Sequence, residues 1–592
     1  MSRFRLGVIA ETVIVDADPN EGVRPVDKSE RIIAVNSIMG QVAILSGKQK
    51  IPAWPVWFST LSSLVFPLAF SPISQWWLAF IVQIPFFYAL AQTSDWKARV
   101  GCGLLWGTGH SIAMGYWLFY ALVNHYDKTL GLSILFFGLC VALPLALIYG
   151  FFALCFHFLY RSGVFFFALA IPSMWILLDF IKEQVPFLIP WGTLGYAAVP
   201  LTRFFQIADI VGIYGLTFLL VMINGLICEW VVSHGRRIDL SGAEGSTFTF
   251  SFKGFLSQIA GKRALSVMLA IGLPCVYGMV RFDRFQQVAA VSLKTDQALE
   301  ATLVQGNFSL KDRWSGMGFQ HRVGTYLRYS SCDMPVSRHI IVWPETVLNE
   351  SGKVNDDLFR QIALVIGPRA LLVTGGLRRD DAGKGVYNSA YFISGDGRLQ
   401  WYDKHILLPY AEESPVDGVL GGYYNAPAEF AVGRTPALVE TPLATIGASI
   451  CFESLYPSAV RRTVKAGAGL LINISNDSWF GKSAMPFVHL DSARVRAVEN
   501  RRFMLRTSNS GISAMISPTG CLLKCSGLFT RESLNGRVAE LSGLSFYSRY
   551  GDWILIVAVL VLMSSLFGII LRPETETACR ENEQGGRNSD PA

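Results

Sequence analysis

The sequence of 592 residues has little charge and no cysteine pair of the kind that binds metal. Charged residues make up 16% of the chain, whereas they make up roughly 25% of ordinary soluble domains. None of the ten cysteines belongs to a C-x-x-C pair, which argues against a zinc site or a redox centre. Since 51% of the residues are hydrophobic, the composition indicates a membrane protein.

The surplus of positive charge is small and dispersed. The formal net charge is +7, but the chain contains no long run of Lys or Arg, so we expect no nucleic-acid partner. The eight histidines are scattered, and we interpret His489 and Asp491 as structural residues. We therefore expect neither a metal ion nor another cofactor.

Long apolar segments occur between residues 51 and 281 and once more at 553–571. A helix needs about 20 mostly apolar residues to cross the hydrocarbon core of a membrane. We therefore predict an α-helical transmembrane bundle of about eight spans, seven of them in the region 51–281. The predicted spans are 54–72, 76–92, 100–123, 131–160, 163–178, 210–232, 264–280 and 553–571. Gly103 and Gly107 form a G-x-x-x-G pattern, which we interpret as a helix-packing face.

Basic residues in the loops predict the orientation of these spans. Lys97 and Arg99 lie between the second and third spans, and five more basic residues lie between the sixth and seventh. Because basic loops stay in the cytoplasm, the region after residue 280 is predicted to lie outside it. The loop 181–209, rich in Pro, Gly and aromatic residues, is compatible with either an interfacial segment or a packing loop.

The ends of the chain carry no recognisable chemistry. Residues 1–50 form an N-terminal extension to which we assign no function. The tail 572–592 is polar and is predicted to be disordered. We expect the last span to return this tail to the cytoplasm.

Residues 298–542 alternate short β-rich runs with polar or helical stretches, which predicts an α/β domain. Three of its polar residues stand at or near the ends of such runs, namely Glu345 in VWPET, Lys404 in WYDKHILLPYAEE and Cys451 in SICFES. A thiol needs a base or a nearby cation to become a good nucleophile. Glu345 is suited to accept the proton, and Lys404 is suited to stabilise the oxyanion that forms on an acyl carbonyl.

These segments resemble the Glu-Lys-Cys triad of the nitrilase superfamily, whose members have an αββα sandwich. The resemblance extends through VQGN (304–307), VTGG (373–376), YNSA (387–390), SNDSWFG (475–481) and RTSNSGISA (506–514). Together with the predicted spans, the chain from Trp54 to Leu571 resembles the apolipoprotein N-acyltransferase family.

The resemblance implies further roles for single residues. Glu345, Lys404 and Cys451 match the catalytic triad, and Glu412 and Glu453 match residues that assist it. Phe452 stands where a tyrosine is common, so an aromatic wall is kept but a hydroxyl is lost. The predicted substrate-binding residues are Trp479 on a mobile loop, Trp314 and Asn307.

For the reaction, the resemblance implies that Cys451 takes an acyl chain from a phospholipid and passes it to the N-terminal amine of a diacylglyceryl-cysteine lipoprotein. It also implies a multi-pass protein of the bacterial inner membrane whose catalytic domain is periplasmic. Two alternatives stay open at this point. One is a membrane-tethered amidase that releases the acyl group to water, and the other is a transporter or receptor with a non-catalytic nitrilase-like domain.

Overall fold

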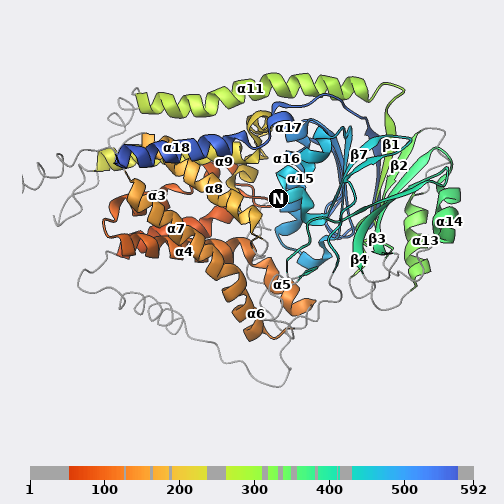
Figure 1. Ribbon diagram of the computed structural model, residues 1–592, viewed down its shortest axis with the longest axis horizontal. Helices are drawn as coiled ribbons and strands as arrows, with labels where there is room; N and C mark the ends of the chain where they lie inside the picture. The colour runs from red at the N-terminus through yellow and green to blue at the C-terminus, as the bar shows by residue number, and fades with distance from the viewer. Residues whose placement is uncertain are drawn as a thin grey trace, which may run out of the picture. The chain divides into compact units, whose positions relative to one another are not determined.

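The computed structural model describes most of the chain from residue 53 to residue 570. The described residues are 53–125, 128–160, 165–185, 188, 190–235, 262–309, 318–330, 338–348, 356–380, 385–409, 411–413 and 430–570. Helices make up the part before residue 293, and a domain of strands and helices follows (Figure 1). The N-terminal extension, the tail and Trp314 lie outside the described residues.

Helical structure occupies all eight segments that were predicted as spans. The helices of this region are α2 (Ala53–Val65), η2 (Phe66–Ala69), η3 (Trp76–Phe80), α3 (Ile84–Gln92), α4 (Trp96–Gly115), α5 (Trp117–Asn124), α6 (Leu130–Phe137), η4 (Gly138–Ala142), α7 (Leu143–Leu159), η5 (Phe166–Ala170), α8 (Ile171–Gln184), η6 (Leu194–Ala198), η7 (Phe204–Ile207), α9 (Ala208–Gly235), α11 (Lys262–Ser292) and α18 (Trp553–Ile570). Within the described part of the chain, three continuous helical stretches are long and apolar enough to cross a membrane: Leu130–Leu159, Phe204–Ser233 and Leu265–Ser292. The number of spans stays a prediction.

Some of the predicted boundaries differ from the observed helices. The segment 100–123 is divided at Tyr116 into α4 and α5. The predicted fifth span stops before Asp179, but α8 continues through this residue because Lys182, one turn later, forms an ion pair with it at 2.6 Å. Helix α11 likewise extends past residue 280 to Ser292.

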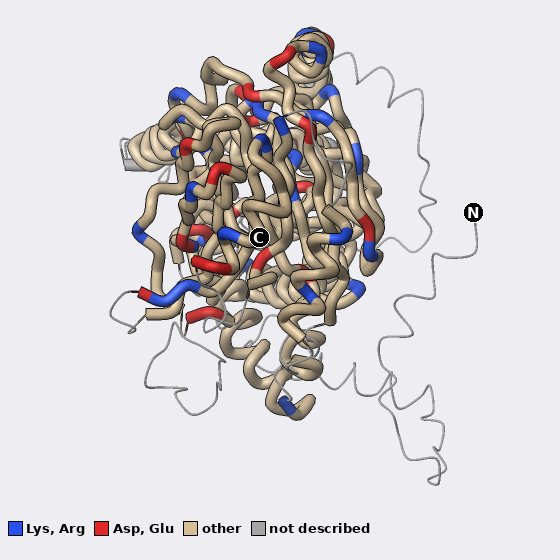
Figure 2. Tube along the Cα trace, turned by 90° about the vertical axis from the view of Figure 1, so that its right-hand side faces the viewer, with Lys and Arg blue, Asp and Glu red and all other residues tan. Residues whose placement is uncertain are grey.

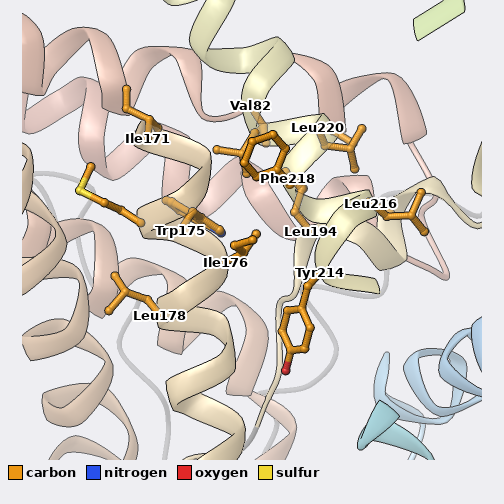
Figure 3. Close-up of a cluster of buried hydrophobic side chains, with 14 of the residues drawn as sticks. Val82, Ile171, Trp175, Ile176, Leu178, Leu194, Tyr214, Leu216, Phe218 and Leu220 are labelled. Carbon is orange, nitrogen blue, oxygen red and sulfur yellow. The ribbon is translucent and has the colours of Figure 1, made fainter. Parts of the chain in front are cut away.

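The apolar helices pack closely where the sequence has small residues. A Cβ atom added at Gly103 would lie 2.3 Å from the carbonyl oxygen of Tyr149, and one at Gly107 would lie 2.6 Å from that of Leu145. The G-x-x-x-G pattern therefore lets α4 lie directly against α7, as predicted. A second part of this core joins α8 and α9 through large side chains such as Trp175 and Phe218 (Figure 3).

Apolar residues of the loop between α8 and α9 are buried among the helices. Leu194, Ala197, Ala198 and Val199 are fully buried in the core of the helical region. Of the two possibilities for this loop, burial of its apolar residues supports the one in which it packs against the helices.

Two six-stranded sheets form the centre of the second region. The first has the order β12-β1-β2-β3-β4-β5 and the second β11-β10-β9-β8-β7-β6. Strands β1, β2 and β3 are parallel, as are β7, β8 and β9, and the outer strands pair antiparallel. The strands are β1 (Leu299–Gln305), β2 (His339–Val342), β3 (Ala370–Arg379), β4 (Val386–Ser394), β5 (Leu399–Asp403), β6 (Leu438–Glu440), β7 (Thr445–Ile450), β8 (Leu470–Ser475), β9 (Phe503–Ser508), β10 (Ala514–Ile516), β11 (Leu522–Cys525) and β12 (Glu532–Val538).

Helices cover the outer face of each sheet, so the domain is the predicted αββα sandwich. Helices α13 (Phe319–Ser330) and α14 (Asp356–Ile366) pack on the first sheet, and α15 (Pro457–Lys465) and α16 (Met485–Asn500) pack on the second. Apolar side chains of both sheets meet between them in one core. Lys, Arg, Asp and Glu are interspersed on this end of the molecule (Figure 2).

Helix α16 joins the sandwich to the apolar helices, because both of its faces are buried. Ala493 and Ala497 pack toward the second sheet, whereas Val495 and Val498 belong to the core of the helical region. Short elements complete the domain: η8 (Cys451–Leu455), η9 (Asp477–Phe480) and α17 (Phe546–Tyr550). The active-site candidates therefore lie in a domain that packs directly on the apolar helices.

Candidate active site

The three predicted catalytic residues follow the ends of three strands. Glu345 comes shortly after β2, Lys404 directly after β5, and Cys451 directly after β7. The first two strands belong to one sheet and the third to the other, so the sandwich brings these residues together from both sheets. A side chain at Gly375 in β3 would collide with the Glu345 backbone, since its Cβ would lie 2.5 Å from the Glu345 Cα. This close approach explains the glycine in the VTGG run.

Lys404 lies between two carboxylates in the interior. Its Nζ is 2.7 Å from Glu412 Oε2 and 3.6 Å from Glu345 Oε1, and its side chain is 1% exposed. Burial by itself lowers the pKa of Lys404, but the charges of Glu412 and Glu345 outweigh burial and raise it. Lys404 is therefore a fixed ammonium ion at neutral pH.

Asn388 in β4 holds the two carboxylates in place. Its Nδ2 donates to Glu345 Oε1 at 2.7 Å and to Glu412 Oε1 at 2.8 Å. Because one amide group bridges both carboxylates, their positions relative to Lys404 are fixed. In the sequence, Asn388 stands in the YNSA run, and this run is the available signal for its role.

Cys451 is buried and lies at the first position of η8. Its backbone φ is 56°, in the left-handed region that non-glycine residues rarely adopt. Burial raises the pKa of the Cys451 thiol, and the Glu345 carboxylate raises it further, whereas Lys404 lowers it. Because the net change is upward, the resting thiol keeps its proton, and a base would have to remove it if the sulfur is to act as a nucleophile.

Glu453 connects the Lys404 loop to the Cys451 turn. Its Oε1 accepts hydrogen bonds from the backbone N–H of His405 at 2.8 Å and of Ile406 at 3.0 Å, and its Oε2 accepts one from the N–H of Ile450 at 2.7 Å. The Tyr402 hydroxyl also donates to this carboxylate, at 2.9 Å. Glu453 therefore links both loops through its hydrogen bonds. Burial raises the pKa of Glu453, although Lys404 and the amide donors oppose this effect.

The remaining predicted residues lie in different environments. Phe452 is 1% exposed, and its ring centroid lies 5.4 Å from Lys404 Nζ. Its supporting role stays a prediction. Trp479 is half-buried in η9. Asn307 donates from Nδ2 to the Phe529 carbonyl at 2.8 Å and thereby joins two loops of the sandwich. Its substrate-binding role, like that of Trp479, stays a prediction.

An aromatic cluster that was not predicted from the sequence connects the sandwich to the apolar helices. Trp117 of α5 lies with its ring centroid 4.3 Å from that of Trp191 and 4.8 Å from that of Phe480 in η9. All three belong to the same apolar core as Cys451 and Phe452. Cys451 thus shares a buried environment with a helix of the hydrophobic region.

Two protein-family models match the chain. The model described as the apolipoprotein N-acyltransferase N-terminal domain matches residues 62–226, and the one described as carbon-nitrogen hydrolase matches residues 339–539. The first match lies within the helical region and the second covers most of the sandwich. The sandwich therefore has the carbon-nitrogen hydrolase fold that the resemblance implied.

Several curated proteins similar to the chain are named apolipoprotein N-acyltransferase. An apolipoprotein N-acyltransferase of Geobacter metallireducens is 28% identical over 67% of this chain and 74% of its own length. One of Rickettsia prowazekii is 26% identical over 86% of this chain and 97% of its own length. One of Allorhizobium ampelinum is 29% identical over 71% of this chain and 75% of its own length. These similarities extend over both the helical region and the sandwich.

Proposed function

Since the chain belongs to the apolipoprotein N-acyltransferase family, we propose that it transfers an acyl chain from a phospholipid to the N-terminal amine of a diacylglyceryl-cysteine lipoprotein. The proposal assigns the transfer to Cys451, with Glu345 as the base and Lys404 as the cation. The observation that carries it is the direct packing of Trp117 of α5 on Phe480, which belongs to the same apolar core as Cys451. Such a position suits substrates that stay in the membrane.

In the first step, the Cys451 sulfur attacks the ester carbonyl of the phospholipid while Glu345 accepts the thiol proton. Lys404 stabilises the oxyanion that develops on the carbonyl oxygen. The ester C–O bond then breaks, the lysophospholipid alkoxide takes the proton from Glu345, and a thioester remains on Cys451.

In the second step, the lipoprotein α-amine attacks the thioester. Glu345 accepts a proton from the amine, the C–S bond breaks, and the proton returns to the Cys451 sulfur. The raised pKa of the Cys451 thiol agrees with this cycle, because the sulfur takes up a proton as it leaves and is then a thiol in the resting enzyme. Glu412 and Glu453 support Lys404 and the loops around it, and Trp479, Trp314 and Asn307 are assigned to the substrates.

The same proposal places the protein in the bacterial inner membrane with about eight spans and with the sandwich in the periplasm. The support is the basic loop 233–263 together with helices at all eight predicted segments. Both substrates carry acyl chains, and moving such chains into water costs about 0.8 kcal/mol per CH2 group. A membrane-bound site avoids this cost.

The mass of the peptide that contains Cys451 tests the proposed chemistry. Purified enzyme incubated with phospholipid alone is expected to gain one acyl group on this peptide, and neutral hydroxylamine is expected to remove it. Addition of a diacylglyceryl lipopeptide then discharges the adduct onto the amine. In Cys451→Ala no adduct forms. Release of the acyl group only to water would support the amidase alternative, and N-acylation by Cys451→Ala would refute the covalent route.

A further inference from the structure

The carbonyl group of Cys451 is held by a side chain from the neighbouring strand. Asn473 in β8 is fully buried, and its Nδ2 donates to the Cys451 carbonyl oxygen at 3.1 Å. The weaker contact from Ser454 Oγ to the same oxygen is 3.4 Å long. Because Cys451 has a φ of 56°, its peptide needs such a partner to stay in the left-handed conformation that directs its side chain.

Asn473 is itself fixed by buried charges. Its Oδ1 accepts a hydrogen bond from Arg506 Nη1, and Arg506 Nη2 donates to Asp477 Oδ2 at 2.8 Å. Burial alone would raise the pKa of Asp477, but Arg506 and then His489 hold it well below its usual range. The Arg506–Asp477 ion pair is therefore intact at all ordinary pH values, and Asn473 cannot rotate without breaking a bond to a buried cation.

The same chain of contacts reaches the aromatic side of the site. Asp477 is the first residue of η9, which also contains Trp479 and Phe480. Phe480 packs on Trp117 of α5. An unbroken series of contacts therefore runs from the nucleophile, through Asn473, Arg506 and Asp477, to the turn that touches the apolar helices.

We propose that Asn473 is a positioning residue, which fixes the Cys451 turn so that the sulfur faces Glu345 and Lys404, and that Arg506 and Asp477 hold Asn473 in place. The inference rests on the proposed role of Cys451 as the nucleophile. Asn473 touches no reacting atom, so its effect is on the fraction of enzyme in which the sulfur is aligned. Its loss should lower the maximal rate of acylation and leave the binding of phospholipid unchanged.

Two substitutions separate positioning from packing and from charge. Asn473→Asp keeps the size of the side chain and its pairing with Arg506 but removes the donor to the Cys451 carbonyl. Asn473→Leu removes the bond to the Cys451 carbonyl and the bond from Arg506 without adding charge. Ser449→Ala is the matched control. Ser449 Oγ accepts a second bond from Asn473 Nδ2 at 3.0 Å and donates to the Ile472 carbonyl at 3.2 Å, so its loss leaves the bond from Asn473 to Cys451 in place.

The measurement is the rate of S-acylation of Cys451 by phospholipid between pH 6 and pH 10, together with the melting temperature of each full-length variant. We expect both Asn473 variants to have a kcat at least about tenfold lower at every pH and a KM close to that of the wild type, because misalignment is not a titration. Ser449→Ala should behave like the wild type. Alkylation of Cys451 by iodoacetamide needs no lipid. Its rate should also be lower in both Asn473 variants and should be equal to that of the wild type in Ser449→Ala.

The alternatives give different results. A purely electrostatic effect would shift the pH profile of Asn473→Asp and restore its rate at high pH, which would overturn the inference. Near-normal acylation by either folded Asn473 variant, or a change in KM alone, would also overturn it. If Asn473→Leu does not fold, Asn473→Asp decides the question. If the wild type forms no thioester, the proposed function fails, whereas the alkylation rates still test the position of Cys451.

Discussion

Replacing Lys404 with Arg keeps the positive charge of the site but changes the shape of the group that carries it. Lys404 Nζ lies 2.7 Å from Glu412 Oε2 and 3.6 Å from Glu345 Oε1, and the Lys404 side chain is 1% exposed. A guanidinium is planar and larger than an ammonium, so it cannot occupy the same point. We expect Lys404→Arg to retain an ion pair with Glu412 and to lose the contact with the oxyanion.

The size of the effect follows from the contact that is lost. One oxyanion contact is worth roughly 2.7 to 4 kcal/mol, so S-acylation of Cys451 should slow by about 100- to 1000-fold. Lys404→Met should differ, because it leaves Glu345 and Glu412 buried without their cation. Breaking a buried pair in this way costs about 3 to 5 kcal/mol of stability. The two variants therefore separate loss of catalysis from loss of folding.

The assay is the initial rate at which the Cys451 peptide gains acyl mass in detergent, with the melting temperature measured on the same samples. Lys482→Arg is the matched control, because Lys482 is exposed and follows η9 without contributing to the proposed chemistry. Its rate should equal that of the wild type. A rate within a few-fold of the wild type in folded Lys404→Arg would remove Lys404 from its assigned role.

Three further predictions concern the thiol, the aromatic cluster and the junction of the two regions. Because burial raises the pKa of Cys451, the rate of its alkylation by iodoacetamide should still rise with pH beyond pH 9. A rate that reaches a plateau near neutral pH would contradict this prediction. Trp117→Leu removes the ring that packs on Phe480, so acylation should slow, by about tenfold if two aromatic pairs of ~0.5 to 1.5 kcal/mol each are lost. Asp209→Asn removes the carboxylate that pairs with Arg501 at 2.8 Å and with Arg281 at 2.7 Å, and should cost about 3 kcal/mol, measured as a lower temperature of half-inactivation. An unchanged temperature would show that these pairs do not hold the regions together.

The sequence by itself determined the positions of the helices and the strand ends. A segment that avoids charge over about 20 residues has few conformations open to it besides a buried or membrane helix, so the eight helical segments were predictable from composition. Glu345, Lys404 and Cys451 were predictable for a related reason. Each follows a β-rich run, and a sheet presents polar side chains at the ends of its strands.

The tertiary structure decided which groups surround these three residues. Asn388, which bridges two carboxylates, and Asn473, which holds the Cys451 carbonyl, are single amides in strand runs. Nothing local distinguishes them from other buried amides, since the distances that define their roles join residues far apart in the chain. Trp117 is a similar case, because only the packing of α5 against η9 brings it near Cys451.

The ends of the helices were also decided by tertiary contacts. The sequence predicts that the span ends at Asp179, because an unpaired charge in an apolar interior is costly. In the fold, Lys182 neutralises it at 2.6 Å, so α8 continues. Local sequence thus specifies where apolar and polar surfaces alternate, whereas the pairing of distant charges and amides depends on the closed sandwich and on its contact with the helices.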